Sequence, residues 1–83
     1  MVPGMTPEQA TRKRQNTEKL LLETENALPR LQSRSLNGTQ QETLQQIRNY
    51  IDGSRSALNI SDLQRAYTLA LKAHLLSDDL LKH

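Results

Sequence analysis

The chain has 83 residues, a formal net charge of +2 and 24% charged residues, which is enough for one small domain. Leucine supplies 15 residues, valine and isoleucine together supply 4, and phenylalanine, tryptophan and cysteine do not occur. This composition argues against a sheet protein, and the lack of cysteine excludes disulfides, thiolate metal sites and cysteine nucleophiles. No run of about 18 apolar residues occurs, so the sequence contains no candidate transmembrane segment.

Residues 1–5 are expected to be a leader or disordered, and residues 6–83 are expected to form a single domain. The first helix is expected over residues 7–35. It begins with Thr6-Pro7-Glu8-Gln9, which supplies an N-cap hydroxyl, a proline at the first helical position and a glutamine that completes a capping box.

Pro29 conflicts with this helix, because a proline inside a helix costs roughly 3 kcal/mol. Leu31 keeps the register of Leu28, which favours a helix that bends at Pro29 and continues. Residues 8–19 contain a single apolar side chain, Ala10. The beginning of this longest helix is therefore expected to overhang the rest of the fold or to fray.

Two further helices are expected over residues 40–58 and 62–82. Thr39-Gln40-Gln41-Glu42 and Ser61-Asp62-Leu63-Gln64 repeat the capping-box pattern, and Asn37-Gly38 is expected to end the preceding segment with a residue of positive φ. Apolar side chains recur every three or four residues in both helices: Leu44, Ile47, Ile51 and Leu58, with Ser54 in the gap, and Leu63, Ala66, Tyr67, Ala70, Ala73, Leu76 and Leu80. Short connections make consecutive helices antiparallel, so the sequence predicts an all-α, up-down-up bundle of three helices.

One ordered set of residues spans much of the chain: Arg34-Ser35-Leu36, Gln40-Gln41-Glu42-Thr43-Leu44, Ile47-Arg48, Ser61-Asp62-Leu63, Ala66, Leu69-Ala70, Lys72-Ala73, Leu75-Leu76 and Asp79-Leu80. This order resembles a helical C-terminal domain of uncharacterised exported or envelope proteins of acidobacterial-type bacteria. That family usually has Gly-Asp in place of Ser61-Asp62, and often Ala or Ser in place of Pro29. The resemblance implies a periplasmic, envelope-associated or secreted protein, of which this chain would be one part, and it brings no catalytic residues.

A weaker similarity connects residues 42–81 with a single tetratricopeptide-type hairpin, through Ala57, Ser61-Asp62-Leu63 and the alanines that follow. The large aromatic residues and the terminal proline of that repeat are missing, and one hairpin cannot stack into an array. The alanines of the third helix are better explained as allowing it to approach the second helix closely.

Candidate catalytic and metal-binding groups are sparse. His74 and Asp78, and likewise Asp79 and His83, have the i, i+4 spacing of metal ligands, but no further ligands are evident in the first two helices. Neighbouring carboxylates on a helix point about 100° apart, so Asp78 and Asp79 do not converge on one proton. We therefore expect no metal site, no cofactor, no small-molecule substrate and no enzymatic activity.

The basic residues Arg12, Lys13, Arg14 and Lys19 form the best candidate anion contact. They favour, as an alternative function, a basic helix that binds nucleic acid or an anionic surface. Nucleic acid is the less favoured ligand, because Tyr50 and Tyr67 are the only aromatic residues and both fall on predicted core stripes, where they are expected to pack together.

Leucines beyond the predicted core stripes suggest a partner interface: Leu22, Leu71, Leu75 and Leu81. Two readings stay open. Either the third helix is sandwiched between the other two and buries all its leucines, which is the favoured reading, or one strip stays exposed for a protein partner or a homodimer. The expected function is a non-catalytic structural or protein-interaction module that acts through apolar helix faces.

Overall fold

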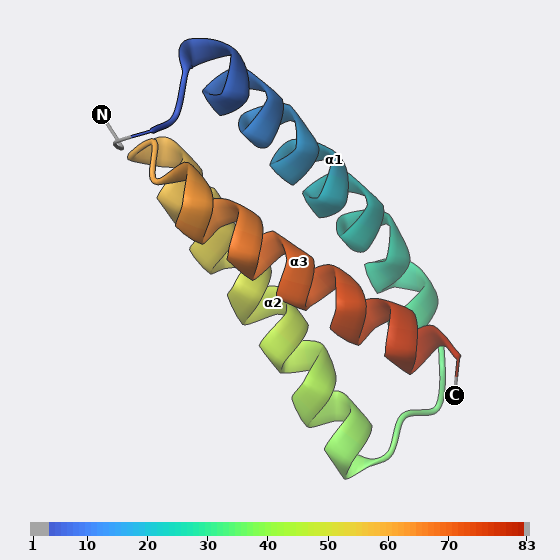
Figure 1. Ribbon diagram of the computed structural model, residues 1–83. Helices are drawn as coiled ribbons and strands as arrows, with labels where there is room; N and C mark the ends of the chain where they lie inside the picture. The colour runs from blue at the N-terminus through green and yellow to red at the C-terminus, as the bar shows by residue number, and fades with distance from the viewer. Residues whose placement is uncertain (1–3, 83) are drawn as a thin grey trace.

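Three helices make up the protein in a computed structural model that describes residues 4–82. They are α1 (Pro7–Gln32), α2 (Gly38–Asn59) and α3 (Leu63–Leu81), and residues 4–82 contain no strand. The chain runs up, down and up again, so the predicted all-α three-helix bundle is confirmed (Figure 1).

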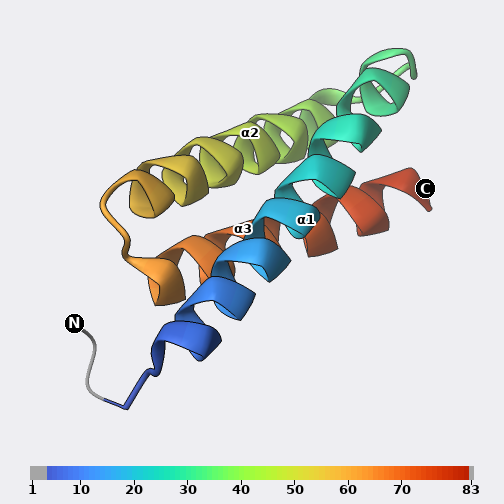
Figure 2. The same ribbon diagram turned by 90° about the horizontal axis from the view of Figure 1, so that it is seen from above.

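The three helices do not pack equally. α2 and α3 form an antiparallel hairpin, and α1 packs along α3 in the same direction while touching α2 only sparsely (Figures 1 and 2). The bundle is elongated, with extents of 45 × 16 × 16 Å. α3 is therefore the central helix, which agrees with its having the most apolar sequence of the three.

One of the three helix starts is capped as predicted. Thr6 accepts from the backbone N–H of Gln9, and the Gln9 side chain accepts from the N–H of Thr6 at 3.0 Å, which completes the capping box of α1. The predicted box at Thr39 is wrong, because Asn37 caps α2 by accepting from Gln40 at 2.8 Å. Gly38 is accordingly the first residue of α2 and does not supply a positive φ.

The third cap is displaced by one residue. Asp62, and not Ser61, caps α3 by accepting from the N–H of Arg65. Ser61 instead has a φ of +58°, the left-handed conformation that joins α2 to α3. The turn thus places its strained residue where the sequence pattern placed the cap.

Pro29 lies inside α1, which continues through it to Gln32. The predicted continuation is confirmed, although the helix ends three residues before the expected position 35. Its last turn closes when the N–H of Ser33 donates to the carbonyl of Pro29 at 3.1 Å.

Twelve apolar side chains form one buried cluster that all three helices supply: Leu21, Leu31, Leu44, Ile47, Ile51, Ala57, Leu58, Leu63, Ala66, Ala70, Ala73 and Leu80. Three alanines on α3 are completely buried, and a Cβ added at Gly53 on α2 would meet Leu69 of α3 at 3.1 Å. Small residues therefore bring α2 and α3 close together, as the sequence predicted.

The beginning of α1 packs into the bundle, so the expected overhang is wrong. Ala10 packs against the core, Arg14 donates to the carbonyl of Leu58 and Thr17 is fully buried. Further along the helix, Thr24 is also fully buried. Each threonine hydroxyl donates to the carbonyl four residues earlier, at 2.7 Å for Thr17 and 2.8 Å for Thr24. With the hydroxyl satisfied inside its own helix, the methyl group faces the core, and threonine serves as an apolar residue.

A hydrogen bond joins α2 and α3 inside the core. The hydroxyl of Ser54, which is fully buried, donates to the carbonyl of Ala66 at 2.7 Å. Ser54 occupies a gap in the apolar stripe of α2, and the bond both satisfies its polar atom and fixes the register of the hairpin.

Candidate interaction surfaces

The four residues of the predicted anion contact have different partners. The guanidinium of Arg14 donates to the carbonyl of Leu58 and to the hydroxyl of Ser61, at the end of α2. The ammonium of Lys13 lies 4.2 Å from the centroid of the Tyr67 ring. Arg12 and Lys19 are exposed. The structure thus divides the basic cluster, and two of its four charges make contacts within the molecule.

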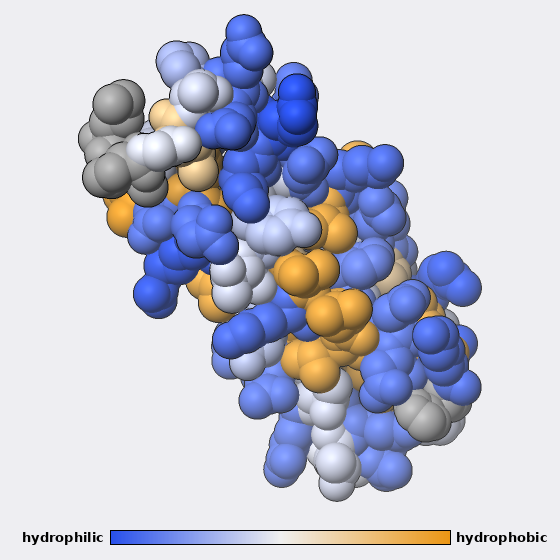
Figure 3. Space-filling model, viewed as in Figure 1, coloured by the Kyte–Doolittle hydropathy of each residue, from blue (hydrophilic) through white to orange (hydrophobic). Residues whose placement is uncertain are grey.

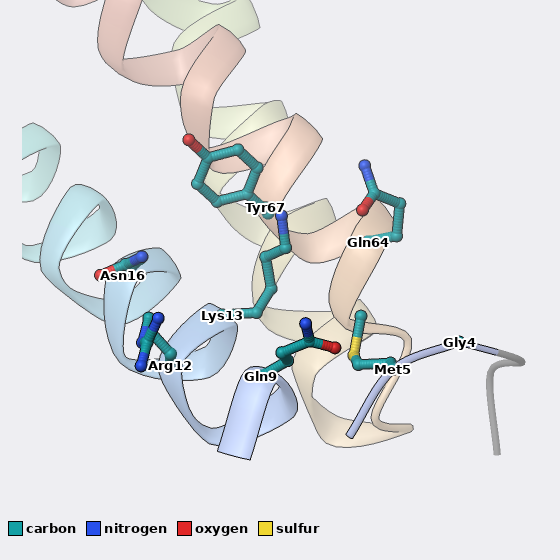
Figure 4. A pocket seen from close by; sticks show the side chains of 8 residues that line it. All are labelled: Gly4, Met5, Gln9, Arg12, Lys13, Asn16, Gln64 and Tyr67. Carbon is teal, nitrogen blue, oxygen red and sulfur yellow. The ribbon is translucent and has the colours of Figure 1, made fainter. Parts of the chain in front are cut away.

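A groove lies between the beginnings of α1 and α3 (Figure 4). Its lining comprises Gly4, Met5, Gln9, Arg12, Lys13, Asn16, Gln64 and Tyr67. Lys13 reaches from α1 toward the ring of Tyr67 on α3, and amide side chains border the pair. This lining combines positive charge with neutral hydrogen-bonding groups and has no carboxylate among the residues that the structure describes.

Each of the two tyrosines lies near a lysine of another helix. Tyr67 lies beneath Lys13, and the ring centroid of Tyr50 lies 5.8 Å from the ammonium of Lys72. Each ring therefore joins two helices through a lysine, α1 with α3 in one case and α2 with α3 in the other.

The four leucines of the predicted partner interface are also separated. Leu81 is half-buried and packs against the core, so it does not contribute an exposed surface. Leu22 is 60% exposed and borders α2, in a groove that it shares with Leu58 and with the ion pair between Glu25 and Arg55. Its surroundings are thus on the α1–α2 side of the bundle.

Leu71 and Leu75 form a surface of their own on α3, here called the leucine strip. They follow Tyr67 at intervals of one turn. Leu69, two residues from Leu71 and therefore on the opposite side of the helix, lies against Gly53 of α2. Leu75 is 57% exposed and Leu71 is half-buried. Figure 3 shows apolar side chains gathered over the middle of α3 and bordered by hydrophilic ones.

Each of the two readings of how α3 is buried describes part of the structure. α3 is sandwiched between α1 and α2, as the favoured reading expects, but that reading is wrong for Leu75, which stays exposed. The sequence reasoning also missed Ile60, which is 75% exposed in the turn between α2 and α3. Its exposure could have been predicted, because Ile60 is an apolar residue between Asn59 and Ser61 that lies outside the apolar stripes of both helices.

The remaining titratable groups do not assemble a metal centre within residues 4–82, where no three His, Asp or Glu side chains come together. Asp78 instead pairs with Lys82 at 3.8 Å. His74 is half-buried, and its Nδ1 is buried without a hydrogen-bond partner among the described residues. The predicted spacing of Asp79 with His83 lies partly outside the described residues.

The fold defines the class of this protein as a small three-helix bundle with one apolar and one basic surface beside its central helix. Comparison with family models, with curated proteins and with solved structures finds no match. Within residues 4–82, none of the helices combines the length and the apolar character needed to cross a bilayer.

Proposed function

We propose that this protein is a non-catalytic interaction module that binds a protein partner through apolar helix faces. The observation that carries the proposal is the exposure of Leu75, at 57%, next to the half-buried Leu71 on the central helix. The exposed part of Leu75 contributes nothing to folding, whereas its burial by a partner contributes about 1–1.5 kcal/mol, roughly half the value for a whole leucine side chain. The resemblance in sequence extends the proposal to a module of a larger bacterial envelope or secreted protein.

Site-specific photocrosslinking in the native cells tests this function. A photoreactive amino acid at position 75 is expected to give an adduct of one discrete mass, and the substitution Leu71→Asp in the same chain is expected to abolish it. A photoreactive residue at Gln46, an exposed position on α2, is the matched control and should give no adduct. If position 75 gives no adduct, or one that Leu71→Asp leaves intact, the proposal is wrong.

The alternative function is a basic helix that contacts nucleic acid or an anionic surface. Exposed Arg12 and Lys19 support it, whereas the intramolecular contacts of Lys13 and Arg14 weigh against it. Titration of the protein with an oligonucleotide, and separately with anionic vesicles, tests this function. Binding that falls steeply with salt and is lost in the double variant Arg12→Gln/Lys19→Gln would favour the alternative.

A further inference from the structure

We propose that the occupant of the leucine strip is a second copy of this chain, packed antiparallel across α3. This inference rests on the proposed function and adds the identity and the orientation of the partner. Four features of one side of α3 support this inference. They are the leucine strip, the basic group at one end of it, the acidic group at the other end and the spacing between them.

Leu75 is the large apolar side chain that the fold leaves exposed on α3, and Leu71 beside it is half-buried. Leu71 does not belong to the side chains that pack against the buried cluster, and Leu75 is more than half exposed. Tyr67, Leu71, Leu75 and Asp78 follow one another at steps of three or four residues, so they lie in one row along the helix.

The two ends of this row carry opposite charge. At the Tyr67 end, the ammonium of Lys13 lies over the ring, and the exposed Arg12 lines the same groove. At the other end, the side chain of Asp78 is 55% exposed while its carboxylate pairs with Lys82 at 3.8 Å. An ion pair of that length at the surface contributes little, so the carboxylate remains available to a stronger partner.

The spacing makes the row self-complementary. With a rise of 1.5 Å per residue, Tyr67 lies about 9 Å before the midpoint of the strip, and Asp78 lies about 8 Å after it. A two-fold axis through that midpoint therefore packs Leu71 of one copy on Leu75 of the other. It also brings Asp78 of each copy next to the Arg12–Lys13 end of the other, which makes two identical charge contacts.

Charge selects this orientation over the parallel one. In a parallel pair, the basic ends would face each other and the carboxylates would face each other, and like charges at an interface oppose association. One strip of two leucines with charged flanks lies in the smallest class of interfaces, below about 1,200 Å² of total buried area, so we expect a weak dimer with a Kd of roughly 10–500 µM.

Sedimentation equilibrium of the purified full chain, at concentrations from about 10 µM to 1 mM, tests the inference. The wild-type protein is expected to dimerise in that range, and Leu75→Asp to remain monomeric. Leu22→Asp is the matched control, because Leu22 is 60% exposed on the other side of α1 and its replacement should leave the dimer intact. Leu75→Gln, which adds no charge, should also be monomeric, and circular dichroism verifies that each variant is helical.

Charge reversal tests the antiparallel orientation. Arg12→Glu and Asp78→Arg should each weaken the dimer by about fivefold, and the double variant should recover most of the affinity. Failure of the double variant to recover would overturn the orientation. A wild-type chain that is monomeric at 1 mM, or a dimer that Leu22→Asp disrupts and Leu75→Asp does not, would overturn the self-association itself.

The failures of the two proposals can be told apart. If the purified chain is monomeric while the photoreactive residue at position 75 still gives its discrete adduct in cells, the partner is another protein and the interaction function stands. If both experiments give nothing, the leucine strip is not an interface, and both proposals are wrong.

Discussion

Both terminal nitrogens of the Arg14 guanidinium lie 3.4 Å from the carbonyl oxygen of Leu58, although 44 residues separate the two in sequence. The carbonyl belongs to the last turn of α2, where it already accepts from the N–H of Ser61 at 3.0 Å and where the helix dipole is negative. Arg34 does the same for α3, donating to the carbonyls of Leu80 and Leu81. Arginines outside the hairpin thus complete the ends of both its helices.

Replacing Arg14 by Ala should destabilise the fold by about 1–2 kcal/mol, because the carbonyl of Leu58 and the hydroxyl of Ser61 lose a charged donor. Urea denaturation monitored by circular dichroism measures the change in the free energy of unfolding. Lys19→Ala, on the same helix, should change it by less than about 0.5 kcal/mol, because Lys19 is exposed. Equal effects of the two substitutions would contradict the capping role.

Replacing Ser54 by Ala should cost about 1–3 kcal/mol, because it leaves the buried bond between α2 and α3 unmade. Ser77→Ala is the matched control, since the Ser77 hydroxyl donates to the carbonyl of His74 within α3. Its loss removes no contact between helices and should cost less than half as much. Thermal melts of both variants, recorded side by side, give the comparison.

Replacing Thr17 by Val should leave the stability within about 1 kcal/mol of wild type, because the methyl group is kept, a second methyl takes the place of the hydroxyl, and the lost hydroxyl bond lies within one helix. Replacing it by Ser removes the methyl group that faces the core and should cost about 1 kcal/mol or more. The order of stability, Val at or above wild type and Ser below it, is the informative result. If Thr17→Ser were neutral, the beginning of α1 would not pack as described.

Replacing Ser61 by Gly should stabilise the fold by about 0.5–1 kcal/mol, because its φ of +58° strains a residue that carries a Cβ. Part of the gain is offset by loss of the hydroxyl that accepts from Arg14 at 3.3 Å. The measurement is the midpoint of chemical denaturation. A lower midpoint for Ser61→Gly than for wild type would show that this hydroxyl contributes more than the strain costs.

The helix caps were only partly predictable because several good N-cap residues lie next to one another in the sequence. Asn37, Thr39, Ser61 and Asp62 are all good N-cap residues, and a glutamine follows three residues after Asn37 and after Ser61. The choice among adjacent candidates depends on the path of the connecting chain, which packing decides. At Thr6 no such competitor stands close by, and there the prediction is correct.

For the candidate surfaces too, the sequence identified residues and the packing determined where they lie. Leu75 and Leu22 are apolar residues off the main stripes, and the sequence singled out both. The two leucines lie on different sides of the bundle because α1 packs along α3 and does not insert between α2 and α3. The involvement of Arg14 and Lys13 in internal contacts also depends on that packing, because their partners lie more than 40 residues away.

The sequence by itself determined the helices, because periodicity, capping residues and the continuation through Pro29 are local properties of the chain. It also determined that small residues line the contact between α2 and α3. Only the tertiary structure decided that the beginning of α1 packs against the hairpin and which leucines stay in water. These outcomes depend on contacts between distant segments, where a threonine with a satisfied hydroxyl packs as an apolar side chain and an arginine serves as a helix cap.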